Sequence, residues 1–362
     1  MRGRVRGMRL GTGLAVAALA FGGCGAEEKT SSSDSGGGSA AETEAAQQKV
    51  EQQLGGTCTL EQYGGKATGL AQATVGFSQS EKEANPFRVA ETQSIRDEAK
   101  KIGVKRLIVT NANSQLNKQI SDIQDLVARG VDALVVAPLN SEGLEPALAA
   151  ARKRDVAVIT VDRKLTGPAH CKDYLTFIGS DFVQQGQRAA DAMIKATAGK
   201  GNVAILLGSS GNNVTEDRNK GFLDRLKEKG PGLKIVAQQT GEFLREKGQS
   251  VTEQLIQSNP DISAIYAHND EMALGALVAL KSAGKTPGED VKVVSVDGTR
   301  NAVRAITKGD MNAVIESNPR FGPLAFKTLQ EFWGDKEIRE NTIISDREYD
   351  EANAKQSLSS AY

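Results

Sequence analysis

From residue 73 onward, the apolar positions of this chain form short runs that alternate with longer segments of mixed polarity. The short runs are rich in β-branched residues, and several are apolar throughout, which is typical of strands buried on both faces of a parallel sheet. They predict strands at Ala73–Phe77, Arg106–Thr110, Ala133–Val136, Val156–Val161, Leu175–Ile178, Asn202–Leu207, Lys234–Gln238, Ala264–Ala267, Lys292–Val296 and Asn312–Glu316. The clearest intervening helices are predicted at Phe87–Ile102, Asn117–Arg129, Gly143–Arg154 and Asp181–Thr197. This alternation predicts an α/β fold.

Polar residues directly follow several of these strands. Asp162–Arg163, His268–Asn269–Asp270 and Asp297–Gly298 each come immediately after a predicted strand. In open parallel sheets, ligands bind beyond the carboxyl ends of the strands. Asp, Arg and Asn side chains can hydrogen-bond several hydroxyl groups at once, so the pattern predicts a site for a polar ligand.

The chain also shows a weak internal similarity. Residues 130–163 and 262–297 both read as strand, loop, helix, strand and a final Asp. Two similar halves facing each other would place Asp162 and Asp297 on opposite walls of one cleft. Any two strand–helix–strand units resemble each other, so the similarity carries little weight alone.

The first residues have the layout of a secretory signal. Four arginines within the first nine residues precede the apolar run Leu10–Phe21, two glycines and Cys24. The apolar run is well short of the roughly 20 residues that a spanning helix needs. Small residues just before Cys24 resemble a bacterial lipobox, although Phe21 stands where Leu is usual. We therefore predict that 1–23 is a lipoprotein signal peptide and that acylation of Cys24 anchors the exported chain to the outer face of the cell membrane. The alternative is an ordinary signal peptide with an incidental cysteine and a periplasmic protein.

A polar segment follows the predicted signal. It includes Thr30–Ser39, TSSSDSGGGS, whose Gly and Ser content is typical of a flexible coil without a core. We predict that residues 24–70 are a flexible tether and N-terminal extension, with an edge between residues 55 and 70. The remaining 290 residues or so are enough for two lobes of ordinary size.

The charge balance argues against a nucleic-acid partner. The chain has 45 basic and 45 acidic residues, and removal of its first 23 residues would leave 41 basic and 45 acidic. The resulting net charge of −4 is the opposite of the clustered basic surface that nucleic acid requires.

Cysteine and histidine are scarce. Beyond Cys24, only Cys58 and Cys171 remain, and a disulfide between them would join the segment before the first predicted strand to the loop at 167–172. Two unpaired cysteines are the alternative, because a sequence does not give their separation. His170 and His268 are the only histidines and no CxxC occurs, so neither a metal site nor a cofactor is expected.

Several motifs together resemble bacterial periplasmic sugar-binding proteins of the ribose-binding type. They are NPF (85–87), ARGVDALVVAP (128–138), VITVDR (158–163), DRNKGF (217–222), AHNDEMALGALVALKSAGK (267–285) and VVSVDGT (293–299). The likeness runs from about residue 73 to about residue 345. Within the family, the chain most resembles the galactofuranose-binding branch, on the strength of GFSQSE (76–81), PFRVAET (86–92), TGEFLREKG (240–248) and YAHND (266–270).

The resemblance implies a fold of two doubly wound parallel-sheet lobes joined by a three-strand hinge, the periplasmic binding protein type I fold. It implies an N-terminal lobe of residues 71–180 plus 317–345 and a C-terminal lobe of residues 181–316 plus 346–362. The family's three crossings between lobes would fall near residues 179–182, 297–300 and 315–319.

The resemblance also implies the ligand-binding residues. They are Asn85, Phe87, Arg88, Asp162, Arg163, Arg218, Phe243, Arg245, Asn269, Asp297 and Ser317. Aromatic rings suit the C–H face of a sugar, and an Asp–Arg pair can bracket vicinal hydroxyls. Each type of residue has an ordinary alternative role: core packing for Phe87, a solvated charge for Arg88 or Arg218, and helix capping for Asn269 or Asp297. Asp270 is the better cap candidate.

Two departures from the family pattern bear on the ligand. Ala137 stands before Pro138 where the ribose type carries Asn, and Ser317 stands, between Glu316 and Asn318, where it carries Gln. Both argue against ribose, while Ala137 and Arg88 are shared with the galactofuranose branch.

The leading hypothesis is a monomeric binding component of an ABC importer. It would capture a monosaccharide, galactofuranose-like or related, by closing its lobes, and would deliver it to the permease subunits. A sugar-sensing receptor that presents its ligand to a membrane signalling protein is the alternative. A transcription regulator would need an N-terminal helix-turn-helix where this chain has the signal and tether. An enzyme is not expected, because neither GxSxG nor a P-loop occurs, although Asp162 and Asp297 are the two carboxylates that a glycosidase would use.

Overall fold

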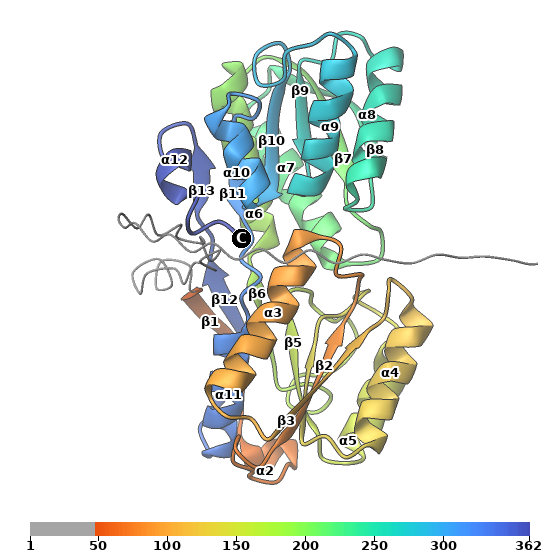
Figure 1. The fold of residues 1–362 in the computed structure, drawn as a ribbon, viewed down its shortest axis with the longest axis vertical. Coiled ribbons are helices and arrows are strands. Elements are labelled where there is room, and N and C mark those ends of the chain that lie inside the picture. The colour runs from red at the N-terminus through yellow and green to blue at the C-terminus, as the bar shows by residue number, and fades with distance from the viewer. Residues whose placement is uncertain (1–47) are drawn as a thin grey trace, which may run out of the picture. The chain divides into compact units, whose positions relative to one another are not determined.

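The structure is a computed structural model that describes residues 48–362 (Figure 1). The predicted signal peptide, Cys24 and most of the predicted tether lie outside the described residues. The described part has two α/β lobes, each built on its own largely parallel sheet, which confirms the predicted fold class. The sheets have the strand orders β1-β12-β6-β5-β4-β2-β3 and β13-β11-β10-β9-β7-β8.

The N-terminal lobe contains the seven-stranded sheet. Its strands are β1 (Lys49–Cys58), β2 (Thr74–Gln79), β3 (Arg106–Asn111), β4 (Ala133–Val136), β5 (Ala157–Val161), β6 (Thr176–Ser180) and β12 (Ile338–Ser345). Its helices are α2 (Leu60–Tyr63), α3 (Pro86–Lys101), α4 (Leu116–Ala128), α5 (Glu145–Arg152) and α11 (Gly322–Trp333). The pairs between neighbouring strands are parallel, except that β1 runs antiparallel to β12.

The C-terminal lobe contains the six-stranded sheet. Its strands are β7 (Gly201–Leu207), β8 (Leu233–Thr240), β9 (Ala264–Ala267), β10 (Lys292–Asp297), β11 (Ala313–Glu316) and β13 (Glu348–Asp350). Its helices are α6 (Phe182–Thr197), α7 (Asn213–Lys229), α8 (Arg245–Ser258), α9 (Asp270–Ser282), α10 (Arg300–Thr307) and α12 (Ala354–Ser357). The short strand β13 pairs antiparallel with β11, and the other pairs are parallel.

Strand β4 shows why apolar runs predicted these sheets. Leu134 and Val135 are consecutive residues of this strand, so their side chains point to opposite faces of the sheet, and both are completely buried. Leu134 packs in one hydrophobic cluster with Ile123 of α4, whereas Val135 packs in another with Ile95 of α3. Because helices cover both faces of the sheet, each position of a central strand must be apolar. Each of the ten predicted strands is present with its ends shifted by at most a few residues.

The chain passes between the two sheets at three points in the described residues. It leaves the first sheet after β6, returns after β11 and leaves again after β12. The crossing predicted near 297–300 is therefore wrong, because α10 carries the chain from β10 to its parallel neighbour β11 within the same sheet. The third crossing is instead at residues 346–347, between Ser345, which pairs with β1, and Glu348, which pairs with β11.

Part of the predicted tether belongs to the N-terminal lobe. Lys49–Cys58 forms the edge strand β1, and Cys58 makes a disulfide with Cys171, with Cα atoms 5.3 Å apart. Thr59 then caps the short helix α2 through a capping box with Gln62. Most side chains of β1 are exposed, so the strand lacks the apolar pattern by which the others were predicted. Backbone pairing and the disulfide hold it instead.

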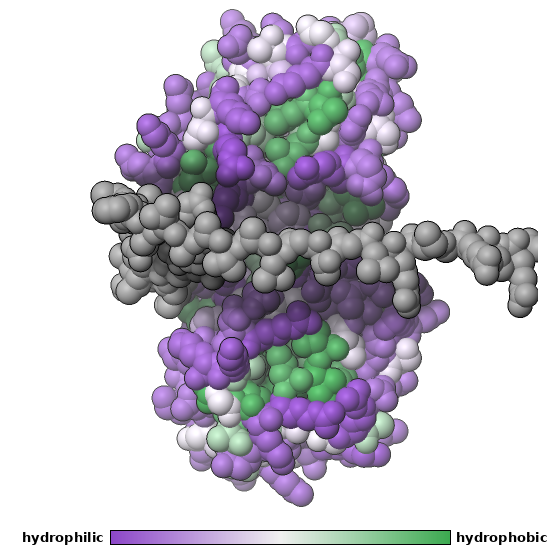
Figure 2. Space-filling model, viewed as in Figure 1, coloured by the Kyte–Doolittle hydropathy of each residue, from purple (hydrophilic) through white to green (hydrophobic). Residues whose placement is uncertain are grey.

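The surface is mostly hydrophilic on the side that Figure 2 shows, with apolar side chains gathered in an area of each lobe. The large apolar side chains that are exposed include Val89, Leu244 and Val278. Within residues 48–362, we find no helix with the length and apolar character needed to cross a membrane.

Candidate functional site

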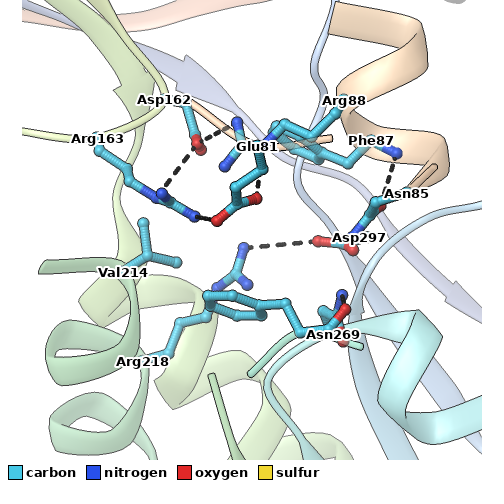
Figure 3. Close-up of a pocket in the computed structure, with 11 residues that line it drawn as sticks. Glu81, Asn85, Phe87, Arg88, Asp162, Arg163, Val214, Arg218, Asn269 and Asp297 are labelled. Atoms are coloured by element: carbon cyan, nitrogen blue, oxygen red, sulfur yellow. Dashed lines mark hydrogen bonds and ion pairs between the residues drawn. The ribbon is translucent and has the colours of Figure 1, made fainter. Parts of the chain in front are cut away.

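A cavity lies between the two lobes (Figure 3). It is lined by Glu81, Asn85, Phe87, Arg88, Asp162 and Arg163 from the N-terminal lobe and by Val214, Arg218, Phe243, Asn269 and Asp297 from the C-terminal lobe. Most of these residues lie in loops just beyond strands or in the first turns of the following helices. The cavity is therefore at the carboxyl ends of both sheets, where the sequence predicted a polar ligand site.

Nine of the eleven predicted ligand-binding residues line this cavity. Among them are Asp162 and Asp297, which come from different lobes, as the internal similarity of the two halves predicted. Both have backbone torsions with positive φ, 66° for Asp162 and 138° for Asp297. Non-glycine residues adopt such torsions at an energetic cost, and they cluster at functional sites.

Arg245 and Ser317 are not among the lining residues, so the structure does not bring these two predicted residues to the cavity. The Arg245 side chain is 45% exposed, and its guanidinium group pairs with Glu271 on the neighbouring helix α9 at 2.8–2.9 Å. Ser317 is buried in the second crossing, where its N–H donates to the carbonyl of Asp297 at 2.8 Å. Ser317 thus supports the strand end that carries Asp297.

Glu81 and Val214 also line the cavity, and neither was predicted from the sequence. Glu81 is the last residue of GFSQSE and follows β2 closely, so its position after a strand was the available signal. Val214 opens α7, and a single apolar residue in the first turn of a helix carries no signal for a ligand site.

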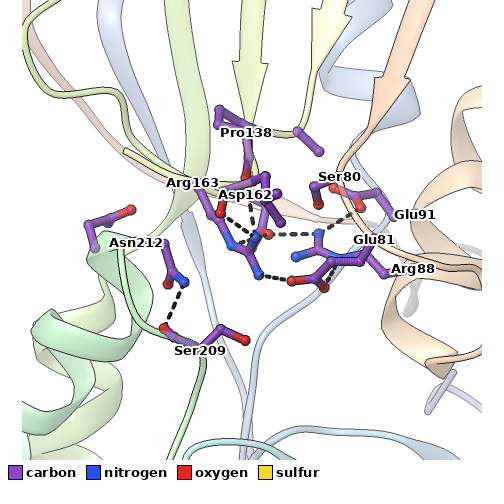
Figure 4. A network of polar contacts seen from close by, with 12 residues as sticks. Ser80, Glu81, Arg88, Glu91, Pro138, Asp162, Arg163, Ser209 and Asn212 are labelled. Atoms are coloured by element: carbon purple, nitrogen blue, oxygen red, sulfur yellow. Dashed lines mark hydrogen bonds and ion pairs between the residues drawn. The ribbon is translucent and has the colours of Figure 1, made fainter. Parts of the chain in front are cut away.

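The N-terminal wall of the cavity is a network of ion pairs around Arg88 (Figures 3 and 4). The Nε of Arg88 lies 2.9 Å from Glu81, and its Nη1 lies 2.9 Å from Glu91 and 2.7 Å from Asp162. Arg163 reaches the other oxygen of Glu81 at 2.7 Å and donates to the carbonyl of Leu139 at 2.9 Å. The two guanidinium groups are thus held by protein carboxylates.

Burial and these ion pairs give two nearby carboxyl groups, those of Glu81 and Glu91, different pKa values. Burial alone would raise the pKa of Glu81, but the positive charges of Arg163 and Arg88 lower it to about 2. Glu91 is deeper, and burial raises its pKa to about 7, with Arg88 opposing and Asp162 reinforcing the rise. Glu81 is therefore ionised at neutral pH, while Glu91 exchanges its proton near neutrality.

The C-terminal wall relies more on backbone partners. Arg218 of α7 donates through Nη1 to the carbonyl of His268 at 2.5 Å, and its Nη2 lies 3.8 Å from Asp297. Burial raises the pKa of Asp297 well above its usual range, although Arg218 opposes the rise. Asn269 caps α9 by accepting from the N–H of Met272, and its amide donates to the carbonyl of Phe243.

Asp270 has a different role from the helix cap for which the sequence favoured it. Its carboxylate accepts hydrogen bonds from Ser295, from the N–H of Gly298 and from the N–H and hydroxyl of Thr299. Because these groups flank Asp297, Asp270 holds the turn that points Asp297 into the cavity.

Two aromatic rings complete the walls. Phe87 lies in the first turn of α3 behind the cap Asn85 and packs edge-on against Tyr362, with ring centres 6.2 Å apart. Phe243, from the opposite lobe, has the Arg163 guanidinium 5.9 Å from its ring centre. A Cβ at Gly208 would collide with the Phe243 ring, so this glycine makes room for the aromatic wall.

The two lobes contact each other beside the cavity. Ser141 of the N-terminal lobe donates through its N–H to the carbonyl of Gly211 at 2.9 Å and accepts from the N–H of Asn213 at 3.0 Å. The N–H of Lys164 donates to the side chain of Asn213 at 2.9 Å. Lys164 and Asn213 adjoin lining residues, so the lobes meet at the margin of the cavity.

The described part of the chain contains no group of three or more His, Cys, Asp or Glu side chains arranged to hold a metal ion. His268 is buried, and burial together with the nearby Arg218 lowers its pKa to about 3, so it is neutral at physiological pH. What the cavity offers is a set of fixed donors and acceptors between two aromatic rings, which suits a small, uncharged, hydroxylated molecule.

Comparison with known proteins gives a consistent result. Residues 75–337 match the family described as periplasmic binding protein domain. The chain is 36% identical over 282 residues to the galactofuranose-binding protein YtfQ of Escherichia coli, covering 76% of this chain and 86% of that protein. It is 38% identical over 268 residues to the ribose import binding protein RbsB of Bacillus subtilis, covering 74% and 83%.

Solved structures that are similar to this chain are also those of sugar-binding proteins. A crystal structure of a galactofuranose-binding protein superposes with a TM-score of 0.76 at 34% identity, covering 79% of this chain and 97% of that one. The binding protein of an arabinose ABC transporter from Shewanella, bound to arabinofuranose, gives a TM-score of 0.75 at 34% identity, covering 79% and 94%. A Mycobacterium smegmatis protein in complex with β-D-fucofuranose gives 0.75 at 36% identity, again covering 79% and 94%.

Proposed function

The chain belongs to the periplasmic binding protein family, and we propose that it is the extracytoplasmic solute-binding component of an ABC importer for a monosaccharide. The observation that carries the proposal is the cavity between the lobes, whose walls combine ion-paired Arg and Asp side chains with the rings of Phe87 and Phe243. The family consists of solute-binding proteins, and binding without chemical conversion is the role proposed here.

A sugar fits the chemistry of this cavity. The rim of a sugar ring carries hydroxyl groups that donate and accept at once, and the walls supply both carboxylates and guanidinium groups. The C–H face of the ring is apolar, and Phe87 and Phe243 supply apolar surface. Positive and negative side chains are nearly balanced along the walls, so an uncharged ligand leaves no buried charge without compensation.

We propose a galactofuranose-like sugar rather than ribose. Arg88, which is 4% exposed, stands at the centre of the N-terminal ion-pair network, so it is a structural part of the cavity and not a solvated surface charge. Ala137 is completely buried beside Pro138. Three solved relatives are described as binding, or bound to, five-membered-ring sugars, which supports a furanose form for the ligand.

A screen of sugars by thermal unfolding tests the proposal. The chain is titrated with D-galactose, D-fucose, L-arabinose and D-ribose, each of which contains some furanose form in solution, and with citrate and an amino-acid mixture as other polar solutes. A ligand that binds only the folded state raises Tm, by an amount that grows with its concentration. We expect galactose, fucose or arabinose to raise Tm more than ribose. An increase with citrate or an amino acid and none with any sugar would refute the assignment.

Export and membrane anchoring through Cys24 are a second part of the proposal. They rest on the sequence alone, because Cys24 lies outside the described residues. Expression in a bacterial host followed by mass spectrometry of the membrane fraction tests them. We expect an N-terminal acylated Cys24 in the membrane fraction, and a Cys24→Ser chain that is no longer retained there. Equal retention of both chains would refute lipid anchoring.

Delivery to permease subunits and a monomeric state complete the proposed role. Closure around a sugar would create the surface that a permease recognises, because the ligand stabilises the arrangement in which it contacts both lobes. Light scattering with and without sugar tests the monomer, and loss of sugar uptake in a deletion strain tests the importer.

A further inference from the structure

Gln185 lies where the lobes are joined, in the first turn of α6 directly after the first crossing. Its side chain is 1% exposed, and its amide makes three hydrogen bonds to different parts of the fold. One of them reaches Arg218 on the cavity wall, and the other two reach segments that pass between the lobes. A buried side chain with this set of partners connects the site to the hinge.

Toward the cavity, the amide oxygen of Gln185 accepts a hydrogen bond from Nε of Arg218 at 2.8 Å. A guanidinium group is planar, so holding Nε in this way fixes the plane in which Nη1 and Nη2 lie. The spacing between the two side chains is set by the backbone. Helices α6 and α7 pack so closely that a Cβ at Gly186 would collide with the carbonyl of Arg218.

Toward the hinge, the amide nitrogen of Gln185 donates to Oδ2 of Asp346 at 2.7 Å and to the carbonyl of Glu316 at 3.3 Å. The other carboxylate oxygen of Asp346 accepts from the hydroxyl of Ser180 at 3.1 Å. Ser180, Glu316 and Asp346 lie at the three crossings between the sheets. A single amide thus contacts two crossings directly and the remaining one through Asp346.

Only an amide meets all three requirements at this position. It accepts from an arginine on one side and donates twice on the other, toward a carboxylate and a carbonyl. A glutamate would keep the bond to Arg218 but would place a second carboxylate against Asp346. A methionine of similar length would leave Arg218 and Asp346 without their buried partner, which is unfavourable.

We propose that Gln185 is a positioning residue that couples the orientation of Arg218 to the geometry of the three crossings, so that sugar binding and lobe closure favour each other. The inference rests on the proposed function, because it takes Arg218 to contact the bound sugar. When a hinge opens, the backbone torsions of its crossing segments change, and with them the positions of Asp346 and Glu316. The Gln185 amide can then no longer keep its hydrogen bonds to Asp346 and Glu316 and its hydrogen bond to Arg218 with equally good geometry. The orientation of Arg218 is therefore coupled to the opening of the hinge.

The first test replaces the amide. Gln185→Met and, as a matched control, Gln184→Met are compared in the full chain, since Gln184 is the half-exposed neighbour on the same helix. With D-galactose as the probe, we expect Gln185→Met to weaken affinity on the order of tenfold, mainly through faster dissociation in stopped-flow measurements. Gln184→Met is expected to bind as the parent does.

The second test exchanges donor and acceptor. Gln185→Glu should weaken binding because two carboxylates then face each other, and adding Asp346→Asn should restore much of the affinity, since the new amide at position 346 donates to the glutamate. A general loss of packing would not be repaired by this exchange. The double variant also keeps the inference testable if Gln185→Met folds poorly.

Small-angle scattering of the sugar-free proteins supplies a measurement that needs no ligand. We expect Gln185→Met and Gln185→Glu to have a larger radius of gyration than the parent, and the double variant to return toward it. Parent-like scattering and parent-like dissociation of Gln185→Met, or no recovery in the double variant, would overturn the inference. If the parent protein binds no sugar while the scattering changes as expected, the proposed function fails and the link between Gln185 and the hinge stands.

Discussion

The two walls of the cavity are built by different means. In the N-terminal wall, Arg88 and Arg163 are held by carboxylates at 2.7–2.9 Å. In the C-terminal wall, Arg218 and Asn269 are held by backbone carbonyls and a neighbouring amide, and Asp297 stays 3.8 Å from Arg218. The charged groups of the N-terminal wall are therefore held in place by one another. In the C-terminal wall, the charge of Asp297 is less strongly compensated by Arg218, so its carboxyl group is more available to the ligand.

This difference has an energetic consequence. Removing one member of a buried ion-pair network leaves its partners uncompensated, so changes in the N-terminal wall should affect both folding and binding. Changes at Asp297 should affect mainly binding, because its burial already favours the uncharged form. Four predictions test this contrast.

The largest effect is expected from Asp162→Ala. The change removes one of the three carboxylates that hold Arg88 and leaves only Glu81 and Glu91 to compensate the two buried guanidinium groups, so we expect a loss of about 3 kcal/mol in the free energy of unfolding and no Tm increase with sugar. Urea denaturation and thermal unfolding with D-galactose measure the two quantities. Asp162→Asn is the matched variant, because Asn tolerates the positive φ of this position. If Asp162→Ala still gives the parent's Tm increase with sugar, Asp162 is not a ligand residue.

Asp297→Asn is expected to affect binding more than stability. An amide resembles the protonated acid in shape, so the free energy of unfolding should change by less than about 1 kcal/mol. Sugar hydroxyls and Arg218 favour the ionised carboxylate in the complex, so loss of that charged acceptor should weaken sugar binding by about 10- to 100-fold. Calorimetric titration and urea denaturation of the same sample check both. A stability loss as large as that of Asp162→Ala would contradict the contrast between the walls.

The pH dependence of stability should reflect three buried carboxyl groups. Burial raises the pKa of Glu91, Asp270 and Asp346 to about 7, so between about pH 4.5 and pH 7 the folded protein binds more protons than the unfolded chain. The free energy of unfolding should therefore fall as pH rises through this window. Glu81 acts in the opposite sense below it, since its lowered pKa stabilises the fold above about pH 4.5 and this contribution is lost toward pH 2.

Urea denaturation across pH 4.5–7.5 measures this slope, and Glu91→Gln supplies the comparison within the N-terminal wall. Glutamine at position 91 cannot ionise, so we expect the decline in stability with rising pH to become shallower. A slope identical to that of the parent protein would show that Glu91 does not titrate in this range.

The smallest effect is expected from Arg245→Ala. Arg245 is nearly half exposed and pairs with Glu271 away from the cavity, so its loss should cost less than about 1 kcal/mol and change sugar affinity by less than about twofold. Calorimetric titration checks the affinity. A loss of binding comparable to that of Asp297→Asn would show that Arg245 takes part in sugar binding, as the sequence predicted.

Much of the site could be predicted because its residues follow strands or open helices within recognisable motifs. Asp162, Arg163, Asn269 and Asp297 were visible in this way. Glu81 was not recognised, since a lone glutamate after a strand looks like any solvated charge until Arg88 and Arg163 are brought against it. The role of Asp270 was mistaken because its partners Ser295 and Thr299 are more than 20 residues away in the chain.

In the fold, too, some elements could be predicted from the sequence and others could not. Continuous apolar runs predicted β4 and β5 because strands covered on both faces must be apolar at every position. The exposed strand β1 gave no such pattern, and its place is set by pairing with β12 and by a disulfide that spans 113 residues. The misplaced crossing near residues 297–300 has a related cause, since local pattern does not tell which sheet the next strand will join.

The amino-acid sequence was enough to predict the alternation of strands and helices, the family, and the polar side chains that follow the strands. These are local properties, written in the spacing of apolar residues and in short motifs. Tertiary structure alone decided which charges meet in the cavity, where the third crossing lies, and that Gln185 joins Arg218 to the hinge. Those features depend on contacts between distant segments, such as the 161 positions between Gln185 and Asp346, and become visible only when packing brings the partners within hydrogen-bond distance.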